Sequence, residues 1–245
     1  MAATRSTQGD DKPVGHSGWI IPLAIFVVTF VLSGLVLLFY LAPQPRPLGS
    51  EQISPTQTGD AVALRVRDLT LNIPANYLQF ESARRSGSRK DIALFALLPD
   101  MEGYSSSNAP AFASDTADSR AVYILVREDT FGLDLQARLA RIYMPYITTP
   151  KGEAGPFGLT RYSFREDSGY RQQDLFVGQT KEGPLMLLCA HASQDAPGSS
   201  CLAIDRPIAK NVNLSYRFKR AHLASWRDIN DSVDGLIARF AQNGN

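Results

Sequence analysis

Residues 157–219 contain five strand-like segments: FGLTRYSF (157–164), QDLFVGQT (173–180), PLMLLCAH (184–191), SCLAIDR (200–206) and NVNLSYRFK (211–219). The connections between them, SGYR, KEGP, ASQDAPGS and PIAK, are short and rich in residues that form turns. Connections of this length join antiparallel neighbours. The stretch therefore predicts an antiparallel meander that forms the core sheet.

Further strands are predicted before this meander. AVALRVRD and LTLNIP (61–74) alternate apolar and polar residues, and Pro74 ends the second piece. DIALFALLP (91–99) and RAVYILVRE (120–128) have the apolar content of buried strands. The sequence between the last two, residues 102–118, is polar and rich in helix-breaking residues, so we expect a long surface loop there.

Two helices complete the predicted domain. The first begins at the candidate N-cap Asp134 and ends near Pro145, and its apolar residues share one face: Leu135, Leu139, Ile142 and Tyr143. The second follows a capping box formed by Ser225 and Asp228, and it carries a core-facing stripe: Trp226, Ile229, Val233, Leu236, Ile237 and Phe240. We expect an α+β domain with both helices packed on one twisted antiparallel sheet.

The element order is similar to that of Mog1/PsbP-like domains. The resemblance lies in the early LTLNIP strand (69–74), the single mid-chain helix and the terminal helix. It implies the same α+β fold, and a shared fold carries no function by itself.

The N-terminal region contains a run without charge, WIIPLAIFVVTFVLSGLVLLFYL (19–41). As a helix it would be roughly 35 Å long, enough to cross a hydrocarbon layer of about 30 Å. A cleaved signal peptide has a shorter apolar core and a small-residue cleavage site, whereas the site here reads Tyr40-Leu41-Ala42. A buried core helix conflicts with apolarity on every side. The run predicts an uncleaved transmembrane anchor.

The flanks of this run set its predicted orientation. Arg5 and Lys12 precede it, whereas Arg46 is the only lysine or arginine in the next twenty residues. The positive-inside rule therefore places the N-terminus in the cytoplasm. We expect a cytoplasmic tail (1–18), a transmembrane helix (19–41), a Pro/Ser/Gln-rich linker (42–59) and an extracytoplasmic domain (60–245).

The two cysteines, Cys189 and Cys201, lie in neighbouring strand-like segments joined by one turn-rich stretch. A disulfide between them would contribute roughly 2.5–3 kcal/mol in the chain-entropy model. Such a pair is typical of an oxidising compartment, here the periplasm of a bacterial envelope. The alternative is two free buried thiols.

Catalytic and cofactor motifs are absent from the sequence. It has no G-x-S-x-G elbow, C-x-x-C, G-x-G-x-x-G or Walker A pattern. A metal or redox module would use Cys189, His191 and Cys201, with His222 as a fourth ligand, but only one close pair has suitable spacing. We therefore expect no metal and no cofactor.

A hydrolase that uses a histidine or carboxylates is the alternative to a non-enzymatic protein. Its candidate groups are two histidines and four carboxylates: His191, His222, Glu153, Glu166, Asp167 and Asp174. We favour a solvated structural role for each, and we expect no catalytic residue.

Candidate interaction residues form two groups. The basic stretch 84–90 could contact anionic lipid or an acidic partner through four residues: Arg84, Arg85, Arg89 and Lys90. The second group combines arginine with aromatic residues, as interfaces often do: Arg161, Arg165, Arg171, Tyr162, Phe164 and Tyr170. The alternative for the first group is a solvated hairpin loop without a binding role. For the second group it is an ordinary exposed strand face.

The formal net charge of +1 and the mean hydropathy of −0.13 describe a globular domain with one span and do not favour a nucleic-acid reader. The sequence therefore predicts a non-enzymatic accessory or protein-interaction module on the outer side of the bacterial inner membrane. Its partners would be the lipid bilayer, through residues 19–41, and an envelope protein.

Overall fold

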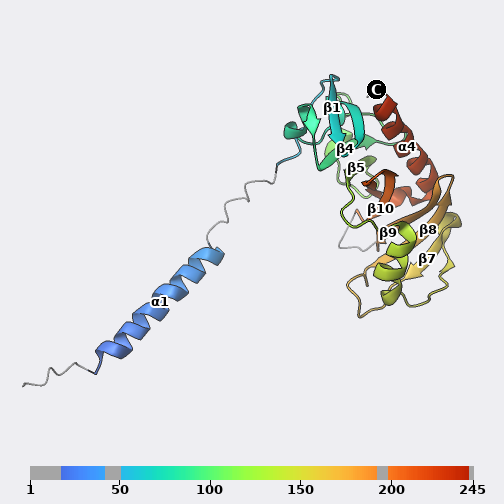
Figure 1. Ribbon diagram of the computed structural model, residues 1–245. Helices are drawn as coiled ribbons and strands as arrows, with labels where there is room; N and C mark the ends of the chain where they lie inside the picture. Colours follow the sequence, from blue (N-terminus) through green and yellow to red (C-terminus); the bar gives the residue numbers. More distant parts are fainter. Residues whose placement is uncertain (1–17, 42–50, 192–197, 243–245) are drawn as a thin grey trace, which may run out of the picture. The chain divides into compact units, whose positions relative to one another are not determined.

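The structure is a computed structural model that describes residues 18–41, 51–191 and 198–242 (Figure 1). The chain divides into two compact units, residues 1–51 and 52–245. Nearly all of the predicted cytoplasmic tail (1–18) lies outside the described residues, and so does the first half of the predicted linker (42–59).

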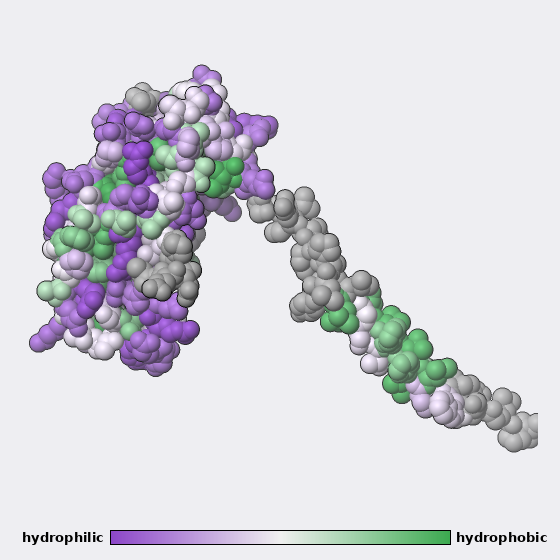
Figure 2. Space-filling view, turned by 180° about the vertical axis from the view of Figure 1, so that it is seen from behind, coloured by the Kyte–Doolittle hydropathy of each residue, from purple (hydrophilic) through white to green (hydrophobic). Residues whose placement is uncertain are grey.

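The N-terminal unit contains one helix, α1 (Ile20–Leu41), which spans 22 residues without an acidic first turn or a basic last turn. Figure 2 shows its surface as predominantly hydrophobic. Its described apolar side chains are exposed, and Phe26 and Phe30 stack at 6.2 Å between ring centroids. Within the described residues, no helix reaches the combined length and apolarity that a membrane crossing requires.

The second unit contains eleven strands and three α-helices among its described residues. The strands are β1 (Ala61–Val66), β2 (Leu69–Pro74), β3 (Gly87–Ser88), β4 (Asp91–Leu97), β5 (Ala121–Glu128), β6 (Glu153–Ala154), β7 (Thr160–Ser163), β8 (Gln173–Thr180), β9 (Gly183–Ala190), β10 (Ser200–Ala209) and β11 (Val212–Lys219). The helices are α2 (Ala109–Ala113), α3 (Leu135–Arg138) and α4 (Trp226–Gln242). The predicted strands and both predicted helices are confirmed, and α2 lies in the predicted long loop.

The strands form two sheets, where the sequence predicted one. The large sheet is antiparallel in the order β4-β5-β11-β10-β9-β8-β7-β6, and the predicted meander supplies its second half. The small sheet has the order β2-β1-β3. Residues 84–90 do not form a hairpin, because β3 within them pairs parallel with β1 through Leu64↔Gly87 and Arg65↔Ser88.

The two helices pack on the large sheet as predicted, and they lie on its opposite faces, a detail that the prediction left open. Alternate residues of a strand point to opposite faces. In β8, Phe176 belongs to the main core together with α4, whereas Leu175 packs in a second cluster with α3 and the turns that follow it. Asp134 caps α3 as predicted, with its carboxylate accepting from the amide of Ala137 at 2.7 Å. Residues 139–143 then continue as a π-turn before Pro145.

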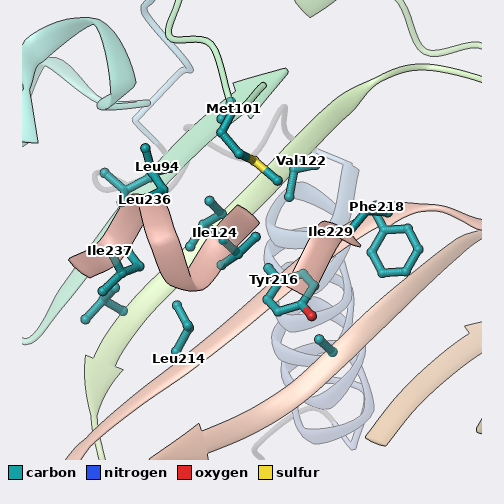
Figure 3. Packing of buried hydrophobic residues seen from close by; sticks show 14 of the residues in the cluster. Leu94, Met101, Val122, Ile124, Leu214, Tyr216, Phe218, Ile229, Leu236 and Ile237 are labelled. Atoms are coloured by element: carbon teal, nitrogen blue, oxygen red, sulfur yellow. The ribbon is translucent and has the colours of Figure 1, made fainter. Parts of the chain in front are cut away.

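The main core lies between α4, the large sheet and the small sheet. The predicted stripe of α4 is buried, as Figure 3 shows for Ile229, Leu236 and Ile237 facing side chains of the central strands. Toward its C-terminal end α4 lies beside the small sheet (Figure 1), where Phe240 meets Tyr77 edge-on at 5.2 Å. The full apolar stripe is therefore core and offers no ligand face.

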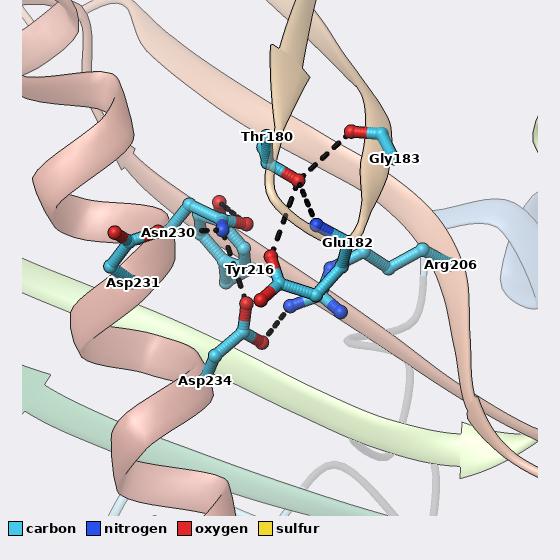
Figure 4. A network of polar contacts seen from close by, with 8 residues as sticks. All are labelled: Thr180, Glu182, Gly183, Arg206, Tyr216, Asn230, Asp231 and Asp234. Atoms are coloured by element: carbon cyan, nitrogen blue, oxygen red, sulfur yellow. Dashed lines mark hydrogen bonds and ion pairs between the residues drawn. The ribbon is translucent and has the colours of Figure 1, made fainter.

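One buried polar network crosses this core (Figure 4). The hydroxyl of Tyr216 donates to the side chain of Asn230 at 3.2 Å, and the Asn230 amide donates to Asp234 at 3.1 Å. Asp234 also forms an ion pair with Arg206. Burial raises the pKa of Tyr216, so this phenol stays protonated and serves as a donor. The network fixes α4 on β10 and β11 through hydrogen bonds and one ion pair.

Candidate functional site

The two cysteines form a disulfide, as predicted. Cys189 and Cys201 lie directly opposite each other on β9 and β10, and both are fully buried. Because each sulfur is bonded to the other, neither is a thiolate available to a metal. The fourth candidate ligand, His222, binds the carbonyl oxygens of Asp118 and Ser119 through Nε2 at 3.1 Å each. Among the described residues, no three metal-binding side chains come together.

The structure brings His191 and Asp174 together, with 3.3 Å between the imidazole Nε2 and the carboxylate. The buried carboxylate also binds Arg220 at 3.3 Å, and Arg220 donates to the carbonyl of Ala190 at 2.7 Å. No hydroxyl of a described serine or threonine is hydrogen-bonded to this imidazole. The group therefore resembles a base with its orienting carboxylate, with no nucleophile beside it among the described residues. These contacts hold the end of β9, at Ala190, against Arg220, the first residue after β11.

Two of the other candidate carboxylates are neutralised by arginine. Glu153 pairs with Arg161 at 2.9 Å, and Asp167 forms a bidentate pair with Arg165 at 2.9 and 3.0 Å. Hydrogen bonding from Arg165 holds the pKa of Asp167 below its usual value. A general acid at neutral pH needs a raised carboxyl pKa, so Asp167 is unsuited to that role. Glu166 lies on the same turn and is exposed.

The predicted aromatic interaction residues are used for packing. Phe164 and Tyr170 stack at 4.9 Å, and Tyr143 meets Tyr170 edge-on at 5.6 Å in the second cluster, where Tyr162 packs at the edge. The exposed Arg171 lies in the turn before β8. This part of the chain therefore forms a small core under α3.

The basic stretch 84–90 does not converge on one site. Arg89 donates to the carbonyls of Ser82 at 3.0 Å and Arg85 at 3.1 Å, so its guanidinium closes the local turn. Arg84 is partly buried, whereas Arg85 and Lys90 are exposed. Lys90 lines a separate cleft of about 310 Å³ beside the ion pair of Arg127 and Asp205. That cleft has nearly balanced charge.

A larger cleft, of about 510 Å³, lies on the open face of the large sheet, where neither α3 nor α4 packs. We call it the Tyr123–Arg217 cleft, and ten residues line it: Ser114, Asp115, Ser119, Ala121, Tyr123, Gly198, Ser200, Arg217, Phe218 and Lys219. Tyr123 of β5 lies directly opposite Arg217 of β11, and Ser200 of β10 lies opposite Lys219. The rigid strands supply the floor, and the loop that contains Ser114 and Asp115 supplies one wall.

The charges of the Tyr123–Arg217 cleft are arranged unevenly. Lys219 binds the carboxylate of Asp115 at 2.6 Å and the carbonyl of Gly198 at 3.2 Å. The Lys219 side chain is 15% exposed, whereas that of Asp115 is 94% exposed. Hydrogen bonding to Lys219 lowers the pKa of Asp115, which is therefore ionised at neutral pH. Arg217 is exposed, and its guanidinium has no hydrogen bond or ion pair within the described part of the chain.

Sequence reasoning did not single out Tyr123, Arg217 or Lys219. Each lies at a strand position whose side chain points away from the main core. In a sequence, such a position looks like any other on an exposed strand face. The one available signal was the long loop 102–118, because loops of this length are often functional. Its residues Ser114 and Asp115 do form a wall of the cleft.

Comparisons with known proteins give information about the fold alone. No protein-family profile matches the sequence, and no curated protein matches it either. An immunity protein of the Stenotrophomonas maltophilia type IV secretion system has a similar structure, with a TM-score of 0.54 and 16% identity over 75% of this chain and 94% of that one. The Neisseria meningitidis iron-regulated outer membrane lipoprotein FrpD aligns with a TM-score of 0.47 and 15% identity over 78% and 97%. At this identity the first likeness shows a shared fold alone.

Proposed function

We propose that this chain is a single-pass protein of a bacterial inner membrane, and that its domain of residues 52–245 binds another protein on the periplasmic side. The Tyr123–Arg217 cleft supports the binding role. It presents an exposed tyrosine and an arginine with no partner among the described residues, side by side on rigid strands. Tyrosine and arginine are enriched among the residues that dominate protein–protein binding energy.

The proposed location depends on two independent features. Residues 19–41 are free of charge over the length of a membrane span, and lysine and arginine are more frequent before this run than after it. The buried disulfide Cys189–Cys201 is typical of an oxidising compartment. An N-terminus in the cytoplasm and a domain in the periplasm satisfy both features at once.

Site-specific photocrosslinking tests the binding role in native membranes. A photoreactive phenylalanine analogue replaces Tyr123, which is 37% exposed within the cleft, and Tyr146, which is 42% exposed outside it, in the full-length protein. We expect a discrete higher-mass adduct from position 123 that is weakened by Arg217→Gln, and none from position 146. Equal adducts at both positions, or no adduct at 123, would contradict the proposed function.

A membrane-tethered hydrolase is the second candidate, favoured by the 3.3 Å contact between His191 and Asp174. It requires a nucleophile or an activated water beside the imidazole. The variant His191→Gln separates the two functions, because it removes the base and leaves the cleft intact. A cellular phenotype reproduced by His191→Gln and not by Arg217→Gln would favour the hydrolase.

A further inference from the structure

We propose that the Tyr123–Arg217 cleft binds an extended acidic segment of the partner protein, in which two carboxylates spaced two residues apart bind Arg217 and Lys219 and one of them displaces Asp115. This inference rests on the proposed function and specifies the chemistry of its partner. It follows from the charge, spacing and exposure of three lining residues.

The charge of the cleft lining favours an acidic ligand. The cleft lining carries two cations and one anion, Arg217, Lys219 and Asp115. The cations project from one strand of the sheet, whereas the anion belongs to the loop before β5. With Asp115 in place the lining is positive, and Arg217 still has no anion among the described residues. A ligand with two carboxylates would neutralise both cations and return Asp115 to solvent.

The spacing of the two cations matches that of side chains on an extended peptide. Arg217 and Lys219 are two residues apart on β11, so they share a face and their Cα atoms are about 7 Å apart at the usual rise of a strand. Carboxylates at positions i and i+2 of an extended peptide share one side with the same spacing. A peptide that runs along β11 would therefore match both cations without bending. Tyr123 lies beside Arg217 and offers a ring against which the peptide can pack.

The two members of the internal ion pair differ in exposure. The Asp115 side chain is 94% exposed and the Lys219 side chain 15% exposed, so the lysine is held in the fold and the aspartate covers it from outside. Exchange of one carboxylate for another breaks one ion pair and forms one, with no change in protonation. The partner's carboxylate therefore competes directly with Asp115.

A recessed lysine also distinguishes a protein segment from a membrane surface. Ser114, Asp115, Ser119, Gly198 and Ser200 line the cleft around Lys219, whose ammonium binds the carbonyl of Gly198 and the carboxylate of Asp115. A bilayer surface is broad and cannot enter such a cleft, whereas an extended chain can. The alternative ligand is an anionic lipid headgroup, and the experiment below distinguishes the two.

The test measures binding of two labelled probe peptides to the full-length protein in detergent micelles by fluorescence anisotropy. The peptides GEGEG and GEEGG are amidated and have the same composition, and only the first places both carboxylates on one side of an extended chain. We expect GEGEG to bind at least threefold more tightly, with affinity falling as salt rises. Asp115→Asn should strengthen GEGEG binding about threefold to tenfold, because the internal competitor loses its charge.

Arg217→Gln should weaken GEGEG binding about tenfold, and Arg171→Gln, which changes an exposed arginine outside the cleft, should leave it unchanged. Circular dichroism confirms that each variant is folded. Equal binding of both peptides, no gain from Asp115→Asn, or displacement by anionic vesicles at equal charge would overturn the inference. A Tyr123 adduct without peptide selectivity overturns it and leaves the proposed function standing. Peptide selectivity without the adduct refutes the proposed function, and with it the inference that a partner protein supplies the acidic segment.

Discussion

Replacing Gly178 by alanine tests how tightly α4 packs on the large sheet. An alanine Cβ at this buried position of β8 would lie 2.4 Å from Cη2 of Trp226 and 2.7 Å from Cδ2 of Leu159. Carbon atoms in contact are about 3.5–4.0 Å apart, so one side chain must move by more than about 1 Å. Trp226 cannot move freely, because its indole nitrogen donates to the carbonyl of Phe157 at 3.1 Å and Arg227 covers its ring at 4.3 Å.

We expect Gly178→Ala to lower the free energy of unfolding by about 2 kcal/mol, within the range known for overpacked cores. For a domain of this size the midpoint of thermal unfolding would fall by about 4–8 °C. The matched control is Gly235→Ala on the exposed side of α4, where an added Cβ meets nothing within 4 Å. Alanine favours a helix interior over glycine by about 1 kcal/mol, so this variant should be stabilised.

Urea unfolding of the full-length protein in detergent, followed by far-ultraviolet circular dichroism, measures both variants. The background Trp226→Phe adds a further check, because phenylalanine lacks the two indole carbons that approach Gly178 most closely. In that background Gly178→Ala should cost at least about 1 kcal/mol less, which a double-mutant cycle detects. Wild-type stability of Gly178→Ala, or a cycle without coupling, would refute the packing argument.

Three further predictions concern the disulfide, the polar network and pH. Replacing Cys189 and Cys201 by serine removes a link between residues 12 apart and should lower the free energy of unfolding by about 3 kcal/mol, a loss that reduction of the wild type should reproduce in denaturant titrations. Asp234→Ala leaves the largely buried Arg206 without its counter-ion and should cost about 2 kcal/mol, whereas its isosteric replacement by asparagine should cost less in the same titration. The lowered pKa of Asp115 means that its stabilising ion pair is fully present above the usual carboxyl pKa of 3.8 and is lost as pH falls through the lower folded-state value. The thermal midpoints of wild type and Asp115→Asn should therefore differ at pH 6 and converge as the pH falls through the lowered folded-state pKa of Asp115 in scanning calorimetry.

The strands were predictable because their signals are local. Alternation and short polar turns define β8 to β11, and the stripe from Trp226 to Phe240 defines α4. The pairing of Cys189 with Cys201 also follows from a local hairpin argument. By contrast, the parallel pairing of β3 with β1 joins residues more than twenty positions apart through only two residue pairs. Nothing in the sequence of residues 84–90 marks such a contact.

The candidate site was less predictable than the fold, for a related reason. Tyr123, Arg217 and Lys219 form a site only because β5 and β11, far apart in sequence, pair with Tyr123 opposite Arg217. The sequence points to His191 and Arg89 by their chemical type alone. In the structure both have internal partners: His191 binds Asp174, and Arg89 binds backbone carbonyls. A residue type alone therefore says little about function until its partners are known.

The uneven covering of the large sheet explains where a partner can bind. On the face opposite α4, α3 and the following turns cover β8 to β10, and Phe112 of α2 covers Phe95 of β4 edge-on at 4.6 Å. The strands between these two covers are β5 and β11, where Tyr123 is exposed although the next residue, Ile124, is buried in the main core. The main core is packed on the α4 side of the sheet and does not depend on side chains from this opposite face. A ligand in the cleft can therefore replace Asp115 and contact Tyr123 without disturbing the packing that holds the domain together.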